Sequence, residues 1–327
     1  MTGLLVEFVL LAAVVVLAGV VLARSCDKIA ELSGLGRSLV GLVLLASATS
    51  LPEFTVGWNA VKIGAIDLTI GDVLGSSLIN LLILSVLDLV SRQRGRMLSR
   101  MAAAHALSAT TAIVLTTIIL LALLIQSDIT FWRLGPGTAA VLVAYILGLR
   151  LVYFDQQFAM QQEPKEDEAE TGRWWPYLLG FLGGAGVILF AGPRLAHTAD
   201  ELAAVTGLGR TFFGTVFVAG ITSLPEVVTT IEALRLGARD MAVGNVFGSN
   251  AFNMIVPAVA DMASPEPIMA LASQTHAITA AAVILVTAVA ALGLLYRAEK
   301  RFWFLEPDAA LVTILIIGAL ALVYFRR

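Results

Sequence analysis

The sequence holds few charged residues and almost no cysteine or histidine. Only 14% of its 327 residues are charged and 58% are hydrophobic, whereas soluble domains average about 25% charged and about 45–50% apolar residues. The single Cys26 excludes an internal disulfide and a zinc–cysteine cluster, and the net charge of −3 offers no basic surface for nucleic acid. These shortages exclude a soluble enzyme, a nucleic-acid-binding protein and a disordered scaffold, and we expect no bound cofactor.

Long apolar runs dominate the sequence instead. A bilayer-spanning helix needs about 20 apolar residues, and almost no strand-like alternation interrupts the runs that reach this length. The predicted fold class is therefore an all-α polytopic membrane protein with ten transmembrane helices. The expected spans are 3–23, 38–61, 69–90, 101–126, 135–153, 176–196, 211–234, 241–262, 271–296 and 306–325.

Lysine and arginine are concentrated in the loops that follow the odd-numbered spans. Loops rich in these residues stay in the cytoplasm, so we predict that these loops are cytoplasmic and that both termini lie outside. The loop after the first span carries Arg24 and Lys28, and we expect Cys26 to lie in it. The C-terminal pair Arg326–Arg327 argues weakly against this orientation.

The two halves of the sequence repeat each other with an offset of 173 positions. Residues 46–81 align without a gap to residues 219–254, and the matches include Thr, Ser, Pro, Glu, Gly and Asn, which apolar composition alone would not produce. The repeats contain the second and seventh spans, so one copy runs inward where the other runs outward. We predict a first five-helix half at 1–154 with its repeat at about 37–90, an acidic cytoplasmic linker at 155–175, and a second five-helix half at 176–327 with its repeat at about 210–262.

Glu53 and Glu226 occupy equivalent positions deep within apolar spans. A carboxylate at that depth costs several kcal/mol unless it has a partner or gives up its charge, and no lysine or arginine lies at a comparable depth. A protonated glutamate that bonds a neighbouring helix is one interpretation. A cation site formed by the pair is the interpretation that we favour.

The residues around each glutamate supply further oxygen atoms. Pro52 and Pro225 precede the glutamates and cannot donate to the carbonyls four residues earlier, so carbonyls near 46–49 and 219–222 are freed. Threonine and serine hydroxyls lie in the same segments. A serine and an asparagine four residues apart share one face of the third span and again of the eighth. Such hard oxygen ligands suit Ca²⁺ or Na⁺.

Three other acidic residues lie within or near the ends of spans. Asp72 lies near the start of the third span, and two interpretations stay open, a peripheral role and a role in cation access. Asp88 and Glu232 lie closer to span ends, where we expect solvated helix caps.

The motif T-S-L-P-E followed by G-x-x-x-G-S-x-x-x-N, in two inverted copies, resembles the cation/calcium exchanger superfamily, and most closely its prokaryotic sodium/calcium exchanger branch. The resemblance implies two inverted five-helix halves with four cation sites between spans 2, 3, 7 and 8. It implies Ca²⁺ ligation by Glu53 and Glu226 with the carbonyls of Thr49 and Thr222. Sodium would use Ala46, Thr49, Ser50 and Ser76 in one half and Ala219, Thr222, Ser223 and Ser249 in the other, with Asn80 and Asn253 completing the centre.

The sequence departs from the family pattern at a few positions. Ala48 and Ile221 stand where a glycine often precedes the Thr-Ser pair, and Asp72 and Ser77 stand where the motif usually has asparagine. Asn253 stands where some members have aspartate. These departures leave the cation site intact but leave the coupling ion open.

The expected function is secondary active antiport of Ca²⁺ against Na⁺ by alternating access in a prokaryotic plasma membrane. Exchange of Ca²⁺, or of another divalent cation, against H⁺ is the alternative. A passive channel would conduct without a counter-ion. An intramembrane hydrolase would need Ser249 as its nucleophile, but no histidine lies in the repeats to activate it. We expect Ca²⁺, Na⁺ and the lipid bilayer as the partners, and no protein partner is evident.

Overall fold

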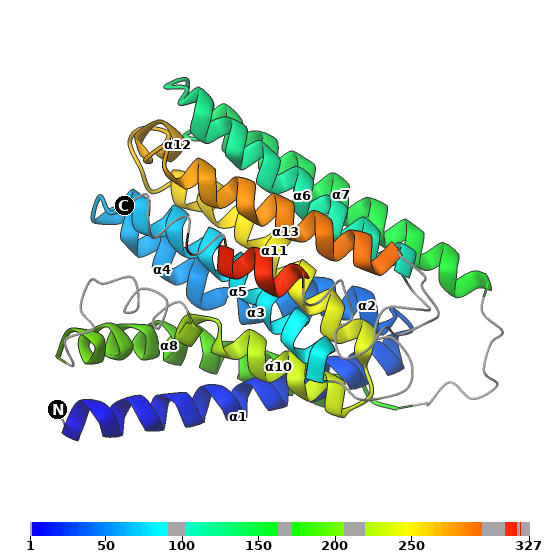
Figure 1. Cartoon of the computed structure of the whole chain (residues 1–327). Coiled ribbons are helices and arrows are strands. Elements are labelled where there is room, and N and C mark those ends of the chain that lie inside the picture. The colour runs from blue at the N-terminus through cyan, green and yellow to red at the C-terminus, as the bar shows by residue number, and fades with distance from the viewer. Residues whose placement is uncertain are drawn as a thin grey trace.

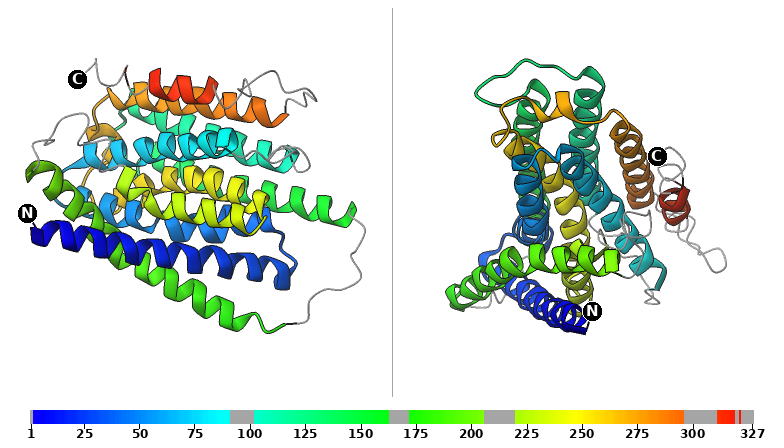
Figure 2. Two further views of the ribbon diagram at one scale, coloured as in Figure 1. Left: turned by 60° about the horizontal axis from the view of Figure 1, so that its bottom comes forward. Right: turned by 90° about the vertical axis from the view of Figure 1, so that its left-hand side faces the viewer.

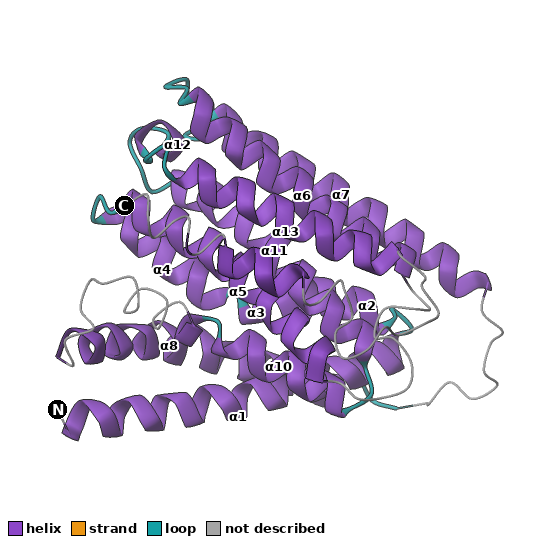
Figure 3. Cartoon of the chain, viewed as in Figure 1, coloured by secondary structure: helices purple, strands orange, loops and turns teal. Residues whose placement is uncertain are grey.

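The computed structural model describes residues 2–90, 102–162, 172–205, 220–295, 311–318 and 321. Within these ranges the chain is helical and forms no strand, apart from one isolated bridge between Phe131 and Leu134 (Figure 3). The all-α fold class is therefore confirmed. The helices are α1 (Thr2–Ser33), α2 (Arg37–Val40), the π-helix η1 (Gly41–Leu45), α3 (Ala46–Thr49), α4 (Leu51–Lys62), α5 (Ile66–Val90), α6 (Ala102–Ile125), α7 (Pro136–Gln162), α8 (Trp175–Val205), α10 (Leu224–Arg235), α11 (Arg239–Asp261), α12 (Ile268–Leu271) and α13 (His276–Leu295).

The long helices lie side by side in a bundle (Figures 1 and 2). Helices α1 and α8 pack along each other at one edge, and α6, α7 and α13 form the opposite side (Figure 1). Helices α4, α5, α10 and α11 lie between these two groups. The two sequence repeats therefore meet in the middle of the bundle.

The bundle is apolar outside and carries its polar side chains inside. Leu17 in α1, Ile146 in α7 and Phe190 in α8 expose 67%, 65% and 79% of their surface, whereas Asn80 and Asn253 expose 1% each. An outer surface of this kind is stable in lipid and not in water, and intramembrane polar groups face the bundle interior. The chain is an integral membrane protein.

Six described helices are long and apolar enough to cross a bilayer, and a pair bent by 43°, Arg37–Thr49 with Leu51–Lys62, would make a seventh. The prediction of ten spans is thus confirmed in part. Helix α11 has 23 residues but is too polar to meet the same criterion. Most of its side chains are buried by neighbouring helices, so it need not be apolar to lie at membrane depth. Spans 7 and 10 fall partly outside the described residues.

Several helices extend beyond the predicted spans. Helix α1 continues to Ser33, ten residues past its predicted end at 23, and α7 continues to Gln162 into the stretch predicted as a linker. Cys26 therefore lies in a helix and is fully buried, so its predicted place in a loop is wrong. Small residues such as Ala18 and Gly184 let α1 and α8 approach closely along this length.

The described parts of the two repeats fold alike. Helices α4 and α10 both end at a glycine with positive φ, +76° at Gly64 and +75° at Gly237. The next amide, of Ala65 in one copy and Ala238 in the other, donates to the carbonyl five residues earlier over 2.8 and 2.9 Å. This left-handed cap needs glycine because a Cβ is disfavoured at positive φ.

Contacts between helix ends show which loops share a face of the membrane. Arg24 in α1 bonds Glu232 in α10 over 2.8 Å, and Arg194 in α8 bonds Glu7 at the start of α1 over 2.8 Å. The first contact joins the end of α1 to the end of α10, and both ends were predicted to be cytoplasmic. The second contact joins α8 to the start of α1, and both of these positions were predicted to lie outside. Glu232 is 4% exposed, so the prediction of a solvated cap there is wrong; Arg24 of the adjacent helix α1 compensates its charge. The side chain of Asp88 lies outside the part of the chain whose side chains the structure describes.

Candidate cation site

Two broken helices bring the predicted site residues together. The helix that begins at Arg37 widens into the π-helix at Gly41–Leu45 and stops at Ser50, whose φ and ψ are −84° and 10°. In the second repeat the break falls at Ser223, with φ and ψ of −81° and 10°. In each repeat the proline occupies the first turn of the new helix, where its missing N–H is not needed.

The first break leaves backbone carbonyls available. Neither the Ala48 nor the Thr49 carbonyl accepts a hydrogen bond from the described residues outside its own helix. The Ala46 carbonyl, by contrast, accepts bonds from the Ser50 amide at 3.1 Å and the Thr49 hydroxyl at 3.2 Å. Of the carbonyls expected to be freed, those at 48 and 49 are thus the better placed to accept an ion.

Glu53 follows the first break and is 1% exposed. Its Oε1 accepts a 3.3 Å bond from the Ser76 hydroxyl of α5, while its Oε2 is buried and has no hydrogen-bond partner among the described residues. One bond from a hydroxyl does not compensate a full negative charge in a low-dielectric interior. The carboxylate is therefore poised to accept a cation.

Glu226 follows the second break and is 0% exposed. Its Oε1 accepts a 3.4 Å bond from the Ser50 hydroxyl, and its Oε2 is buried with no partner in the described part of the chain. The bond joins the carboxylate of one repeat to the break of the other. The two glutamates that the sequence predicted to form one cation site therefore belong to segments that are in direct contact.

Hydroxyl groups complete the contact between the repeats. Thr49 Oγ1 lies 3.3 Å from Ser249 Oγ of α11, so the serine considered as a nucleophile contacts a threonine and not a histidine. Ser223 Oγ is buried and unpartnered among the described residues, and Thr222 is also buried. Ala219 lies outside the described residues.

Asparagine side chains lie in the same interior. Asn253 is 1% exposed, and neither atom of its amide has a hydrogen-bond partner in the described ranges. Asn80 donates to Asn250 Oδ1 over 3.0 Å and keeps its own Oδ1 unpaired. Asn250, which also donates to the Ser77 carbonyl at 3.2 Å, was missed by the sequence reasoning, because the equivalent position in the first repeat is a serine.

A third buried carboxylate differs from the two glutamates because both of its oxygens accept hydrogen bonds. Asp261, at the end of α11, is 1% exposed. It accepts bonds from the Gly135 amide and the Thr138 hydroxyl, both at 2.6 Å, and from the Ile268 amide at 2.7 Å. Both of its oxygens have donors, so Asp261 fixes a loop to α11. Glu53 and Glu226 each accept one serine hydroxyl at Oε1 and have no donor at Oε2 among the described residues, which makes them the candidate cation ligands.

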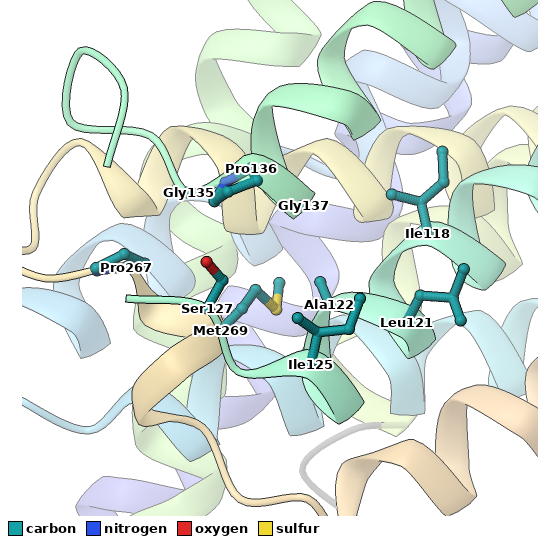
Figure 4. Close-up of a pocket in the computed structure, with 10 residues that line it drawn as sticks. All are labelled: Ile118, Leu121, Ala122, Ile125, Ser127, Gly135, Pro136, Gly137, Pro267 and Met269. Atoms are coloured by element: carbon teal, nitrogen blue, oxygen red, sulfur yellow. The ribbon is translucent and has the colours of Figure 1, made fainter. Parts of the chain in front are cut away.

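The chemistry of the cluster favours hard cations. Carboxylate, hydroxyl, amide and carbonyl oxygens are the ligands that Ca²⁺ prefers. A separate cavity of about 220 Å³ near the start of α7 is lined mainly by apolar side chains such as Ile118, Leu121 and Met269 (Figure 4). It offers no charged ligand and is not the cation site.

Similarity to known proteins extends over most of the chain. A family model described as "Sodium/calcium exchanger protein" matches residues 3–154 and 176–325. The "Putative antiporter CaxA" of Alkalimonas amylolytica is 27% identical over 307 residues, covering 89% of this chain and 93% of that protein. The "Inner membrane protein YrbG" of Escherichia coli (strain K12) is 28% identical over 229 residues, covering 68% of each chain.

A solved structure shares the fold. The sodium-calcium exchanger NCX_Mj superimposes with a TM-score of 0.71 and 20% sequence identity, and the match covers 98% of this chain and 99% of that one. At this identity the likeness shows the arrangement of the helices alone.

Proposed function

Because the chain belongs to the sodium/calcium exchanger protein family, whose members are transporters, we propose that it is a secondary active antiporter that exchanges Ca²⁺ for Na⁺ by alternating access. The observation that carries the proposal is the pair of buried glutamates, Glu53 and Glu226, each with one oxygen that lacks a donor among the described residues. A prokaryotic plasma membrane is the proposed location.

The inverted repeat supplies the mechanism. Two halves that run in opposite directions across the membrane can exchange their conformations, which opens the shared site first to one face and then to the other. The matching breaks at Ser50 and Ser223 support two five-helix halves and ten spans in all. Glu53 follows one break and Glu226 the other. In this mechanism both carboxylates lie between the two halves as these move relative to each other.

The proposed ligands come from both repeats. Glu53 and Glu226 would bind Ca²⁺ from opposite sides, and the hydroxyl and carbonyl oxygens at each break would bind Na⁺ when Ca²⁺ is absent. The support is that these groups converge, through the bonds from Ser50 to Glu226 and from Ser76 to Glu53. The proposed set is Ala46, Thr49, Ser50, Glu53, Ser76, Asn80, Ala219, Thr222, Ser223, Glu226, Ser249 and Asn253.

A flux assay with separate gradients tests the coupling ion. The purified protein is placed in liposomes, and Ca²⁺ uptake is measured with a Na⁺ gradient alone and with a pH gradient alone. We expect uptake with the Na⁺ gradient and none with the pH gradient. If one Ca²⁺ exchanges for three Na⁺, a membrane potential also changes the rate, whereas exchange for two H⁺ would be electroneutral. Uptake with the pH gradient alone would establish the H⁺-coupled alternative, and Ca²⁺ flux without any counter-ion would establish a channel.

Orientation is tested with introduced cysteines. Native Cys26 is buried and cannot report, so the background is Cys26→Ala. Leu35→Cys lies in the loop after α1 and Ile63→Cys at the end of α4, where the native side chains expose 38% and 80% of their surface. In right-side-out vesicles an impermeant thiol reagent should label position 63 at once and position 35 only after permeabilisation. The reverse pattern would place the termini inside.

A further inference from the structure

Asp72 breaks the symmetry between the two repeats. Its counterpart in the second repeat is Asn245, whose amide donates to the hydroxyls of Thr229 and Thr230, both at 3.1 Å. The positions equivalent to those two threonines in the first repeat are occupied by valine and glycine, which have no hydroxyl. The first repeat thus has a carboxylate in place of an amide and lacks both polar partners.

The position of Asp72 is fixed by two contacts between α4 and α5, which lie side by side (Figure 1). Three residues before it, the Thr69 hydroxyl donates to the Gly57 carbonyl at 3.0 Å, and four residues after it, Ser76 donates to Glu53. Residues three and four apart share one face of a helix. Asp72 therefore lies on the α4-facing side of α5, one turn from the cation site toward the N-terminal end of α5.

The surroundings of Asp72 leave its charge uncompensated. Its Oδ2 is buried without a hydrogen-bond partner among the described residues, while the residue as a whole is partly exposed. The neighbouring group one turn along α5 is the acidic Glu53, which Ser76 contacts. At the nearby helix end His276 is 3.1 Å from Asp67. No lysine or arginine of the described chain forms an ion pair with Asp72.

The equivalent position in the second repeat, Asn245, differs from Asp72 in both exposure and charge. Asn245 is 0% exposed and carries no charge. The first repeat thus has a partly exposed carboxylate one turn from the candidate cation site, and the second repeat has a buried, neutral amide at the equivalent position. A partly exposed carboxylate attracts a divalent cation more strongly than a buried neutral amide does.

We propose that Asp72 is a cation-accepting position at one mouth of the exchanger, which takes up an incoming divalent cation before it reaches Glu53 and Glu226. The inference rests on the proposed function. Because Asn245 gives the other mouth no equivalent group, the protein binds Ca²⁺ with unequal apparent affinity at its two faces.

The experiment compares Ca²⁺ transport from the two faces. Right-side-out and inverted membrane vesicles carry the wild type or Asp72→Asn, and the KM for Ca²⁺ is measured with the same counter-ion gradient. We expect Asp72→Asn to raise KM about tenfold at the face nearest the start of α5, as loss of one charge-assisted contact of about 1.4 kcal/mol would do. The KM at the opposite face and the maximal rate should stay within about twofold.

Two further variants keep the test decisive. Asp72→Glu should retain the wild-type KM at both faces, because it restores the carboxylate. Asp67→Asn removes a charge from the same helix end, where 61% of the side chain is exposed, and should change KM by less than about twofold because exposed charges are screened. An equal rise in KM at both faces in Asp72→Asn, or no rise at all, would overturn the proposal while wild-type exchange continued. Absence of Ca²⁺ exchange in the wild type would overturn the proposed function instead.

Discussion

Replacing either buried glutamate with glutamine should abolish Ca²⁺ transport. Glu53→Gln and Glu226→Gln each remove one of the two carboxylates of the candidate site, and both native residues are at most 1% exposed. A bond to a charged group contributes about 1.5–3 kcal/mol, so losing one should lower Ca²⁺ affinity by about 10- to 150-fold. Ca²⁺ uptake into liposomes at micromolar Ca²⁺ is the measurement.

The same variants should remain folded. Glutamine has nearly the shape of glutamate and removes a charge that no donor compensates, so thermal stability in ion-free buffer should equal or exceed that of the wild type. Glu266→Gln makes the same chemical change at an exposed position and should leave uptake within about twofold. Near-normal Ca²⁺ uptake by a folded Glu53→Gln or Glu226→Gln protein would disprove the site.

A single methyl group added at Gly248 should also eliminate most transport. Helix α11 approaches the first repeat so closely here that a Cβ would collide with the Leu42 carbonyl oxygen and would lie 2.7 Å from the Ala46 Cβ. Overpacking of this kind costs about 1–3 kcal/mol, and backbone atoms cannot move aside as a side chain can. We expect Gly248→Ala to lower both thermal stability and the Ca²⁺ uptake rate, the latter by about tenfold or more.

An exposed glycine provides the control for Gly248→Ala. Gly183 lies in α8, and a Cβ there would meet nothing within 4 Å among the described residues. Gly183→Ala should therefore keep wild-type stability and transport. If Gly248→Ala behaved like Gly183→Ala, the close approach of α11 to the first break would not be needed for function.

The sequence was sufficient to predict the parts of the structure that depend on solvent and on backbone chemistry. Apolar runs predicted the helices, since a lipid-embedded chain must satisfy its backbone bonds internally. Pro52 and Pro225 predicted the breaks, because proline cannot donate to the preceding turn. The repeat predicted that Glu53 and Glu226 are equivalent, and the bond from Ser50 to Glu226 shows that the two repeats meet.

Features that depend on packing between distant segments could not be predicted. Helix α1 runs past Arg24 and places that arginine against Glu232, a partner 208 positions away that no local pattern indicates. The contacts of Asn250 and Asn245 could not be predicted by aligning the two repeats, because the first repeat has Ser77 and Asp72 at the equivalent positions. The π-helix at Gly41–Leu45 has no sequence signal, although such turns often occur at functional sites.

In the proposed alternating-access cycle, the buried oxygens without a donor among the described residues would also govern when the protein can change conformation. Midway between the two open states of that cycle the site is closed to water on both sides, and then only bound cations or protons can compensate Glu53 and Glu226. Passing through that closed state empty costs more free energy than passing through it loaded. In the proposed cycle the empty protein therefore stays open to one face until its next cation binds, so the ion gradients do not leak without exchange and no dedicated gate is needed.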